Sequence, residues 1–159
     1  MNFEEKTVYR DVDKQLAAVK AALTWLDTPY HHHARVKGVG VDCAQLIIAA
    51  ALESGIISNE QATIAPNYPV QWHLHNRDEK LLEVLESFGC IEIDKEMTQA
   101  GDIVCFQFGR VTSHLGIKIN ETQFIHARYD TKKVVINTMQ HEWLDRWTKT
   151  YTLPGVING

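Results

Sequence analysis

One strongly apolar stretch constrains the fold of this chain more than any other feature. From Asp42 to Ser54 the sequence is DCAQLIIAAALES, and Gly55 follows it. The stretch is apolar on nearly every side of a helix, and such a helix has to be buried. We therefore predict a central helix covered by other elements, with Asp42 as its N-cap, because a short carboxylate can accept hydrogen bonds from the free N–H groups of the first turn.

Two further helices are expected in the first half of the chain. Between Asp11 and Asp27 apolar residues recur on one helical stripe, and Thr28-Pro29 ends the pattern, since the residue before a proline avoids the α region. A third helix is predicted from Asp78 to Phe88, with Gly89 as its stop. The residues of the first stripe are Leu16, Val19, Leu23 and Leu26.

The second half of the chain has the pattern of short strands separated by turn residues. Helices followed by an antiparallel sheet predict an α+β fold, and 159 residues suit a single domain over residues 1–159. Trp143 and Trp147 lie four residues apart, which predicts one helical turn packed on the core. The predicted strands are Asp102 to Phe108, His114 to Ile119, Gln123 to Arg128, Val134 to Met139 and Tyr151 to Leu153.

Composition excludes several classes of protein. The net charge is −4 with no basic block, so nucleic-acid binding is not expected. The start of the chain has no apolar signal segment and no stretch is long enough to span a membrane, so we expect synthesis in the cytoplasm without a signal peptide. Three cysteines without a CxxC pair favour neither a disulfide framework nor a structural zinc site.

Cys43, at the start of the predicted central helix, is the first candidate for chemistry. A thiol at a helix N-terminus is close to the positive end of the helix dipole and to unpaired N–H groups, which favour the reactive thiolate. Its own backbone N–H could also help to form an oxyanion hole. The alternative is that Cys43 is a small buried residue with no reaction to perform.

Two histidines strengthen the case for catalysis. His114 begins one predicted strand and His126 lies in the next, an even number of residues away, with a turn at Asn120-Glu121-Thr122 between them. In such a hairpin the two side chains share one face as a direct or diagonal pair. A base oriented by a second polar group is what an activated thiol requires. Taken singly, each histidine could also be a satisfied strand residue.

Four segments in order carry a resemblance to a known family. They are TPYHHHARVKGVGVDCAQLI, GDIVCFQF, SHLGIKI and FIHAR, and together they cover about Leu26 to Arg128. The set resembles the NlpC/P60 family of peptidoglycan cysteine peptidases, and within it the bacteriophage-associated branch, which has similar TPY…GVGVDC and YP…WHLH segments. The resemblance implies a papain-like fold, in which a helical part with the cysteine packs on an antiparallel sheet with the histidine.

The resemblance also implies a role for each matching residue. Cys43 corresponds to the nucleophile, His114 to the general base and His126 to the third polar member that orients the base. Tyr30 corresponds to a tyrosine that holds substrate or shapes the oxyanion region. Asp42 corresponds to an acidic residue that, in related enzymes, contacts the free amine of the stem peptide.

The loop between the second and third helices, Ile56 to Arg77, is long for a compact domain, and such loops are usually functional. Trp72 in this loop could line a substrate cleft, or it could anchor the loop to the core. His31, His32 and His33 with His73 and His75 could suggest a metal site, but adjacent histidines in an extended segment point in opposite directions. We therefore expect no metal and no cofactor.

The chain departs from the family pattern at two places. Ala44-Gln45 replaces the usual Ser-Gly after the cysteine, and the three histidines after Tyr30 replace a glycine pair. The lost serine hydroxyl leaves the recognition of the amine, and so the bond cleaved, open.

Together these features predict a cysteine endopeptidase that cleaves cell-wall stem peptides around D-glutamate and a diamino acid. The phage resemblance implies tail-tip proteins as partners, and a place in a virion tail or gene-transfer particle acting in the cell wall. One alternative is an amidase or acyltransferase that uses the same Cys-His pair. Another is a non-catalytic tail adaptor whose site is vestigial.

Overall fold

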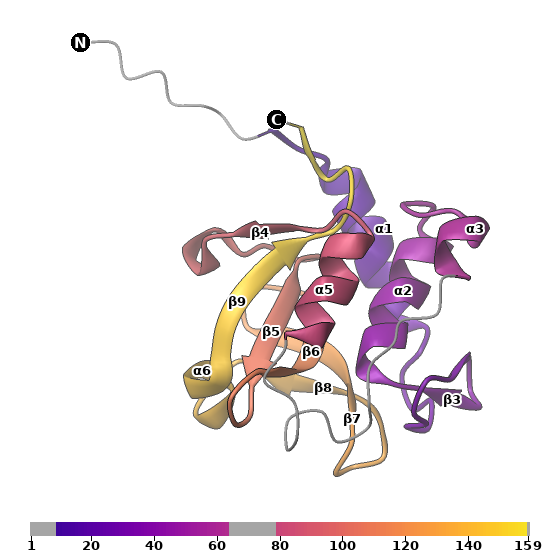
Figure 1. Ribbon diagram of the computed structural model, residues 1–159, viewed down its shortest axis with the longest axis vertical. Coiled ribbons are helices and arrows are strands. Elements are labelled where there is room, and N and C mark those ends of the chain that lie inside the picture. Colours follow the sequence, from indigo (N-terminus) through magenta and orange to yellow (C-terminus); the bar gives the residue numbers. More distant parts are fainter. Residues whose placement is uncertain (1–8, 64–78, 159) are drawn as a thin grey trace.

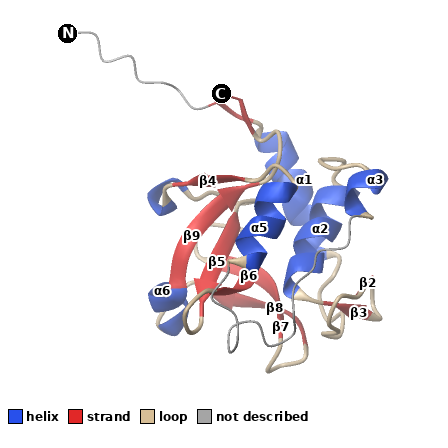
Figure 2. Ribbon diagram, viewed as in Figure 1, coloured by secondary structure: helices blue, strands red, loops and turns tan. Residues whose placement is uncertain are grey.

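The computed structural model describes residues 9–63 and 79–158, and it combines helices with a six-stranded antiparallel sheet. The larger helices gather on one side of the sheet (Figure 1; by element type in Figure 2). The predicted α+β class is therefore confirmed. The helices are α1 (Val12–Leu23), α2 (Cys43–Glu53), α3 (Asn59–Ala62), α5 (Lys80–Ser87) and α6 (Glu142–Arg146), with a 3-10 turn at Lys95–Met97.

The strand order in the large sheet is β4-β9-β5-β6-β7-β8. The strands β5 to β8 were predicted within a few residues, and β9 starts earlier than expected, at Trp147. The short strands β4 and β10 were not predicted. Two small sheets, β1-β10 and β2-β3, complete the fold. The strands are β1 (Tyr9–Arg10), β2 (Arg35–Val36), β3 (Gly40–Val41), β4 (Ile91–Ile93), β5 (Ile103–Gln107), β6 (Thr112–Lys118), β7 (Gln123–Arg128), β8 (Lys133–Thr138), β9 (Trp147–Thr152) and β10 (Ile157–Asn158).

The helix α2 is buried, as its sequence predicts. It packs between α1, α5 and one face of the sheet, which contributes Leu115, Ile117 and Ile125 to the same core. Asp42 is its N-cap, and the Asp42 side chain accepts a hydrogen bond from the backbone N–H of Gln45 at 2.8 Å. The residue that follows Asp42, Cys43, therefore starts the helix at its buried tip.

The predicted packing face of α1 is partly wrong. The helix ends at Leu23, and Leu16 and Leu26 are 48% and 40% exposed. The buried side is instead Gln15, Ala18, Val19, Ala21 and Ala22. Both α1 and the alanine-rich α2 present small residues to the core, which lets the two backbones approach closely. Leucine spacing alone does not show this preference for close packing.

The opposite face of the sheet carries a second, aromatic core. Val104, Phe106, Phe124 and Met139 are buried there, and Trp143 of α6 and Trp147 pack against them. Trp143 thus packs on the core as predicted, whereas Trp147 belongs to β9 and not to the helical turn. The sheet has a helical core on one face and an aromatic core on the other.

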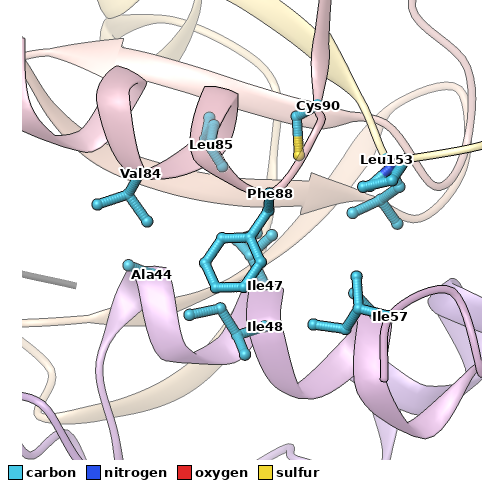
Figure 3. Close-up of a pocket in the computed structure, with 11 residues that line it drawn as sticks. Ala44, Ile47, Ile48, Ile57, Val84, Leu85, Phe88, Cys90 and Leu153 are labelled. Carbon is cyan, nitrogen blue, oxygen red and sulfur yellow. The ribbon is translucent and has the colours of Figure 1, made fainter. Parts of the chain in front are cut away.

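An apolar cavity lies between α2 and α5 (Figure 3). Ile47 and Ile48 of α2 and Val84 and Phe88 from the α5 side line it, together with Cys90. It has no acid or base in its lining. The predicted functional loop contains the short helix α3, and its residues 64–78, with Trp72, His73 and His75, lie outside the described part of the chain. Of the described helices, none has the length and apolar character needed to cross a membrane.

Candidate active site

Burial sets the protonation state of Cys43. The side chain is only 7% exposed. Burial, together with a smaller effect of the nearby Asp42 charge, raises the pKa of the Cys43 thiol to about 12. The backbone N–H groups of Leu115, Ala44 and Cys43 itself lower this pKa without overcoming burial. The expected thiolate is therefore wrong for the resting protein: the thiol keeps its proton.

The Leu115 N–H, which acts on the Cys43 thiol, lies at an opening in the sheet. The ladder between β6 and β7 consists of the pairs Ile117↔Ile125 and Lys118↔Phe124, so it stops before Leu115. The Lys118 N–H points toward β5, where it donates to the Asp102 carbonyl at 2.9 Å. Because N–H directions alternate along a strand, the Leu115 N–H points to the β7 side. On that side, where a complete ladder would have a partner on β7, this N–H lowers the pKa of the Cys43 thiol.

His114, which directly precedes Leu115, is paired with His126. His114 Nε2 and His126 Nδ1 are 2.6 Å apart, and the ring centroids are 4.8 Å apart. Continuing the β6-β7 register places Gly116 opposite His126, so the two histidines are a diagonal pair. A Cβ on Gly116 would lie 2.9 Å from the Phe124 ring and 3.4 Å from the His126 Cβ, so glycine leaves the room that the pair needs.

A third polar group, Asn137 of β8, completes this row. His126 Nε2 lies 2.7 Å from Asn137 Oδ1. His126 is completely buried and His114 half-buried. The sequence analysis did not identify Asn137. The residue lies in the strand KVVINT, which is otherwise rich in β-formers. Asparagine is unfavourable in strands, so its presence there could have indicated a specific hydrogen bond.

Aromatic rings enclose the histidine pair. Trp143 lies 4.9 Å from the His126 ring and 6.0 Å from the His114 ring, measured between centroids. The Phe124 centroid is 4.6 Å from that of His126. Arg128 sits over Trp143 at 5.4 Å. The structure therefore adds Trp143 and Arg128 to the surroundings of the site, neither of which the sequence had linked to the histidines.

Both histidines are held in the neutral form. Burial lowers the pKa of His126 to about 4, with Arg128 acting in the same direction and the Asn137 hydrogen bond against it. Burial also lowers the pKa of His114 well below its ordinary value, helped by His126 and Arg128. At neutral pH the pair is uncharged and can accept a proton.

Tyr30 lies within electrostatic reach of Cys43. Burial raises the pKa of the Tyr30 hydroxyl, and the charges of Cys43 and Asp42 raise it further. Its backbone is tied on two sides: the Tyr30 N–H donates to the Lys132 carbonyl at 2.7 Å, and a single bridge joins it to Val41. The phenol therefore keeps its proton and can donate a hydrogen bond beside the sulfur.

The carboxylate of Asp42 accepts hydrogen bonds from backbone N–H groups within the protein. It is fully buried, Oδ1 caps α2, and Oδ2 accepts the His33 N–H at 2.7 Å. His32 Nδ1 is 3.7 Å from the same Oδ2. Asp42 thus ties the histidine segment to the start of α2, and its contact with a substrate amine stays a prediction.

The three adjacent histidines make no metal cluster with described neighbours. The rings of His32 and His33 stack, with centroids 3.7 Å apart. Over residues 9–63 and 79–158, no group of three or more histidine, cysteine or carboxylate side chains could hold a metal ion. Trp72 lies outside the described residues, so its predicted place in the cleft stays a prediction.

Comparison with protein-family models identifies the family of this chain. The family model described as NlpC/P60 matches residues 27–153, which is most of the sequence. The chain belongs to the NlpC/P60 family. The match includes all of the candidate residues named above.

Solved structures of NlpC/P60 proteins share this fold. An NLP/P60 lipoprotein-like protein of Staphylococcus aureus aligns over 96% of this chain and 45% of its own, with a TM-score of 0.63 and 19% identity. The NlpC/p60 domain of the peptidoglycan hydrolase SagA aligns over 87% of this chain and 97% of its own, with a TM-score of 0.58 and 18% identity. The predicted papain-like arrangement of this NlpC/P60 chain is therefore confirmed.

Two further similarities come from named hydrolases. Dipeptidyl-peptidase 6 of Lysinibacillus sphaericus is 23% identical over 124 residues, which is 78% of this chain and 36% of that protein. The peptidoglycan hydrolase RipB of Mycobacterium tuberculosis aligns over 93% of this chain and 67% of its own, with a TM-score of 0.60 and 14% identity. The NlpC/P60 chain thus spans about a third of the length of the curated relative.

Proposed function

We propose that this NlpC/P60 chain is a cysteine endopeptidase that hydrolyses peptidoglycan stem peptides, with Cys43 as nucleophile and His114 as general base. One observation carries the proposal. The Leu115 N–H lowers the pKa of the Cys43 thiol, and in the preceding residue His114 Nε2 lies 2.6 Å from His126 Nδ1. In this proposal a thiol, a neutral base and a group that orients the base come together at the point where β6 and β7 separate.

In the proposed reaction the thiol proton moves to His114 as the Cys43 sulfur attacks the peptide carbonyl. Neither group is charged at rest, so the proton transfer accompanies the attack. His114 then protonates the leaving amine, and water hydrolyses the thioester. Backbone N–H groups at the start of α2 and the protonated Tyr30 hydroxyl are the donors available to the developing oxyanion.

The substrate class follows from the family. Peptidoglycan hydrolases such as SagA and RipB share the fold, and the dipeptidyl-peptidase of L. sphaericus shares sequence. We propose cleavage around D-glutamate and a diamino acid, with Tyr30 and Trp72 contacting the substrate. Asp42 is buried, and Ala44 stands in place of the family's serine, so both positions argue against recognition of a free amine through them.

The setting we propose is a phage tail or a gene-transfer particle that acts in the cell wall, with tail-tip proteins as partners. The proposal rests on the TPY…GVGVDC segment, which resembles that of phage-associated NlpC/P60 proteins. Sedimentation of the protein with purified tail or particle fractions would support this setting. Its absence from such fractions would remove it without affecting the peptidase proposal.

Defined muropeptides test the reaction. The wild type and a Cys90→Ala control should release the same peptide fragments, identified by mass spectrometry, and Cys43→Ala should lower the rate by about 1,000-fold or more. Cleavage at the sugar–peptide amide, or transfer to an added amine, would favour an amidase or acyltransferase. Turnover by Cys43→Ala, or none by a folded wild type, would refute the proposal, and the second result would favour the adaptor alternative.

A further inference from the structure

Asn137 occupies the end of the polar row that starts at His114, and this row fixes where protons sit. We infer that Asn137 is a positioning residue that selects the tautomer of both histidines, so that Nδ1 of His114 is the atom that takes the Cys43 proton. The catalytic part of this inference rests on the proposed function. The tautomers themselves do not, because they are a property of the unliganded protein.

The first step concerns His126. Asn137 Oδ1 is a carbonyl oxygen, which only accepts hydrogen bonds, and it lies 2.7 Å from His126 Nε2. The proton of His126 is therefore on Nε2. With its pKa lowered to about 4, His126 is neutral and carries one ring proton, so its Nδ1 has a free lone pair.

The second step passes this constraint to His114. His126 Nδ1 lies 2.6 Å from His114 Nε2, and a hydrogen bond of that length requires one proton between the two nitrogens. Since His126 Nδ1 has none, His114 Nε2 carries it. His114 is also neutral, so its Nδ1 is the bare, basic nitrogen. Three hydrogen-bonding groups thus point in one direction, from His114 through His126 to Asn137.

The backbone pairing of β7 with β8 holds His126 and Asn137 in this arrangement. The β7-β8 ladder is paired over its full length, with Phe124 opposite Asn137 and His126 opposite Val135. Side chains at 124, 126, 135 and 137 therefore share one face of the sheet, and Asn137 is a diagonal neighbour of His126. Trp143 and Phe124 pack against the His126 ring and restrict its rotation.

The direction of the row has a chemical consequence. When His114 Nδ1 accepts the thiol proton, Nε2–H of the resulting imidazolium still donates to His126, which stabilises the charge. Asn137 cannot accept a proton, so the positive charge stays within the His114–His126 pair, which can return the proton to the leaving amine. If the Asn137 amide were reversed, the row would reverse too, His114 Nδ1 would be protonated, and it could not accept the thiol proton.

Nitrogen NMR of protein labelled with ¹⁵N-histidine tests the tautomers without any substrate. In the wild type, both His114 and His126 should show a protonated Nε2 and an unprotonated Nδ1 at pH 7, with assignments from His114→Gln and His126→Gln. Asn137→Ala should lose the single tautomer, and Asn137→Asp should keep it, because a carboxylate still accepts from His126 Nε2. Asn59→Ala on the exposed start of α3 is the control and should match the wild type.

Kinetics supply the second readout. Asn137→Ala should lower kcat by roughly 10- to 100-fold with little change in KM, and Asn137→Asp should restore most of it. The added carboxylate in Asn137→Asp should raise the pKa of the histidine pair and so move the acidic limb of the pH profile to higher pH. In the wild type, Arg128 lowers the pKa of both histidines, and Asp130 raises that of His126. A purely structural role for Asn137 would change stability without this rescue or this shift.

The outcomes separate the inference from the proposed function. A protonated Nδ1 on His114 in the wild type, or tautomers unchanged in Asn137→Ala, would overturn the inference even if stem peptides are hydrolysed. The expected tautomers in a folded protein that hydrolyses no stem peptide would uphold the proton arrangement and refute the proposed function instead.

Discussion

At the scale of single residues, burial decides the chemistry of the candidate pair. The start of α2 offers N–H groups to Cys43, yet burial raises the pKa of its thiol to about 12 and lowers the pKa of His114. A resting thiolate–imidazolium pair would need the opposite shifts. The account therefore has an uncharged resting site in which the base acts only as the sulfur attacks.

The charge of Arg128 gives this arrangement a pH signature. Arg128 lowers the pKa of both His114 and His126, and the reaction needs His114 neutral. Activity is thus lost as pH falls through the pKa of the pair. In Arg128→Gln the pKa rises, so the acidic limb of kcat/KM should move to higher pH. Arg110→Gln, a change at an exposed arginine, is the control. An unmoved limb in Arg128→Gln would contradict this electrostatic role.

Part of the site could be predicted from the sequence because it depends on the order of residues along the chain and on even spacing between strand residues. The place of Cys43 at a helix start and the even spacing of His114 and His126 are both local patterns. Asn137 was missed because its role depends on the register of β8 against β7, which the residues alone do not specify. The burial of Asp42 was missed for a similar reason, since it depends on where the His33 backbone folds back.

At the scale of elements, the unequal pairing of neighbouring strands forms the site. The β7-β8 ladder is complete, whereas the β6-β7 ladder has two pairs and then opens toward the tip of α2. A buried helix pattern and three strand patterns predicted these elements within a few residues. They did not predict the opening, because strand propensity describes single strands and not where two of them separate.

The packing of α1 provides a test at this scale. Ala22 is completely buried, whereas Leu16 is 48% exposed. Ala22→Leu should lower the free energy of unfolding by about 1–3 kcal/mol, because it forces side-chain volume into a close-packed interface. Leu16→Ala, the matched change on the exposed side, should stay within about 0.5 kcal/mol of the wild type. Urea denaturation measures both, and a larger cost for Leu16→Ala would restore the leucine stripe as the packing face.

At the scale of the whole molecule, one buried ion pair joins segments that are far apart in the sequence. Arg10 of β1 donates to both oxygens of Asp102, at 3.0 and 2.8 Å, and Gln15 of α1 donates to Asp102 at 3.0 Å. The strand β1 also pairs with β10. Two-residue strands have no recognisable sequence pattern, so this closure could not be predicted. It fixes α1, and through α1 the helix that carries Cys43.

Breaking this ion pair should be costly. Arg10→Ala leaves the fully buried Asp102 carboxylate without its cation, and the free energy of unfolding should fall by about 3–5 kcal/mol. Lys20→Ala removes an exposed positive charge from α1 and serves as the control. Thermal or urea unfolding measures the difference. Equal stability of the two variants would mean that the pair does not hold the ends of the domain together.

The most direct measurement of the central claim compares two cysteines within one molecule. Cys43 and Cys90 are 7% and 8% exposed, and burial raises the pKa of both thiols to about 12, so neither exposure nor acidity separates them. If His114 serves Cys43 as a base, iodoacetamide should alkylate Cys43 faster than Cys90 in the folded protein, as peptide mapping by mass spectrometry would show. Activity should fall in step with that labelling, and His114→Ala should abolish the difference in rate. Equal labelling of the two cysteines, or full activity after complete labelling of Cys43, would contradict the account.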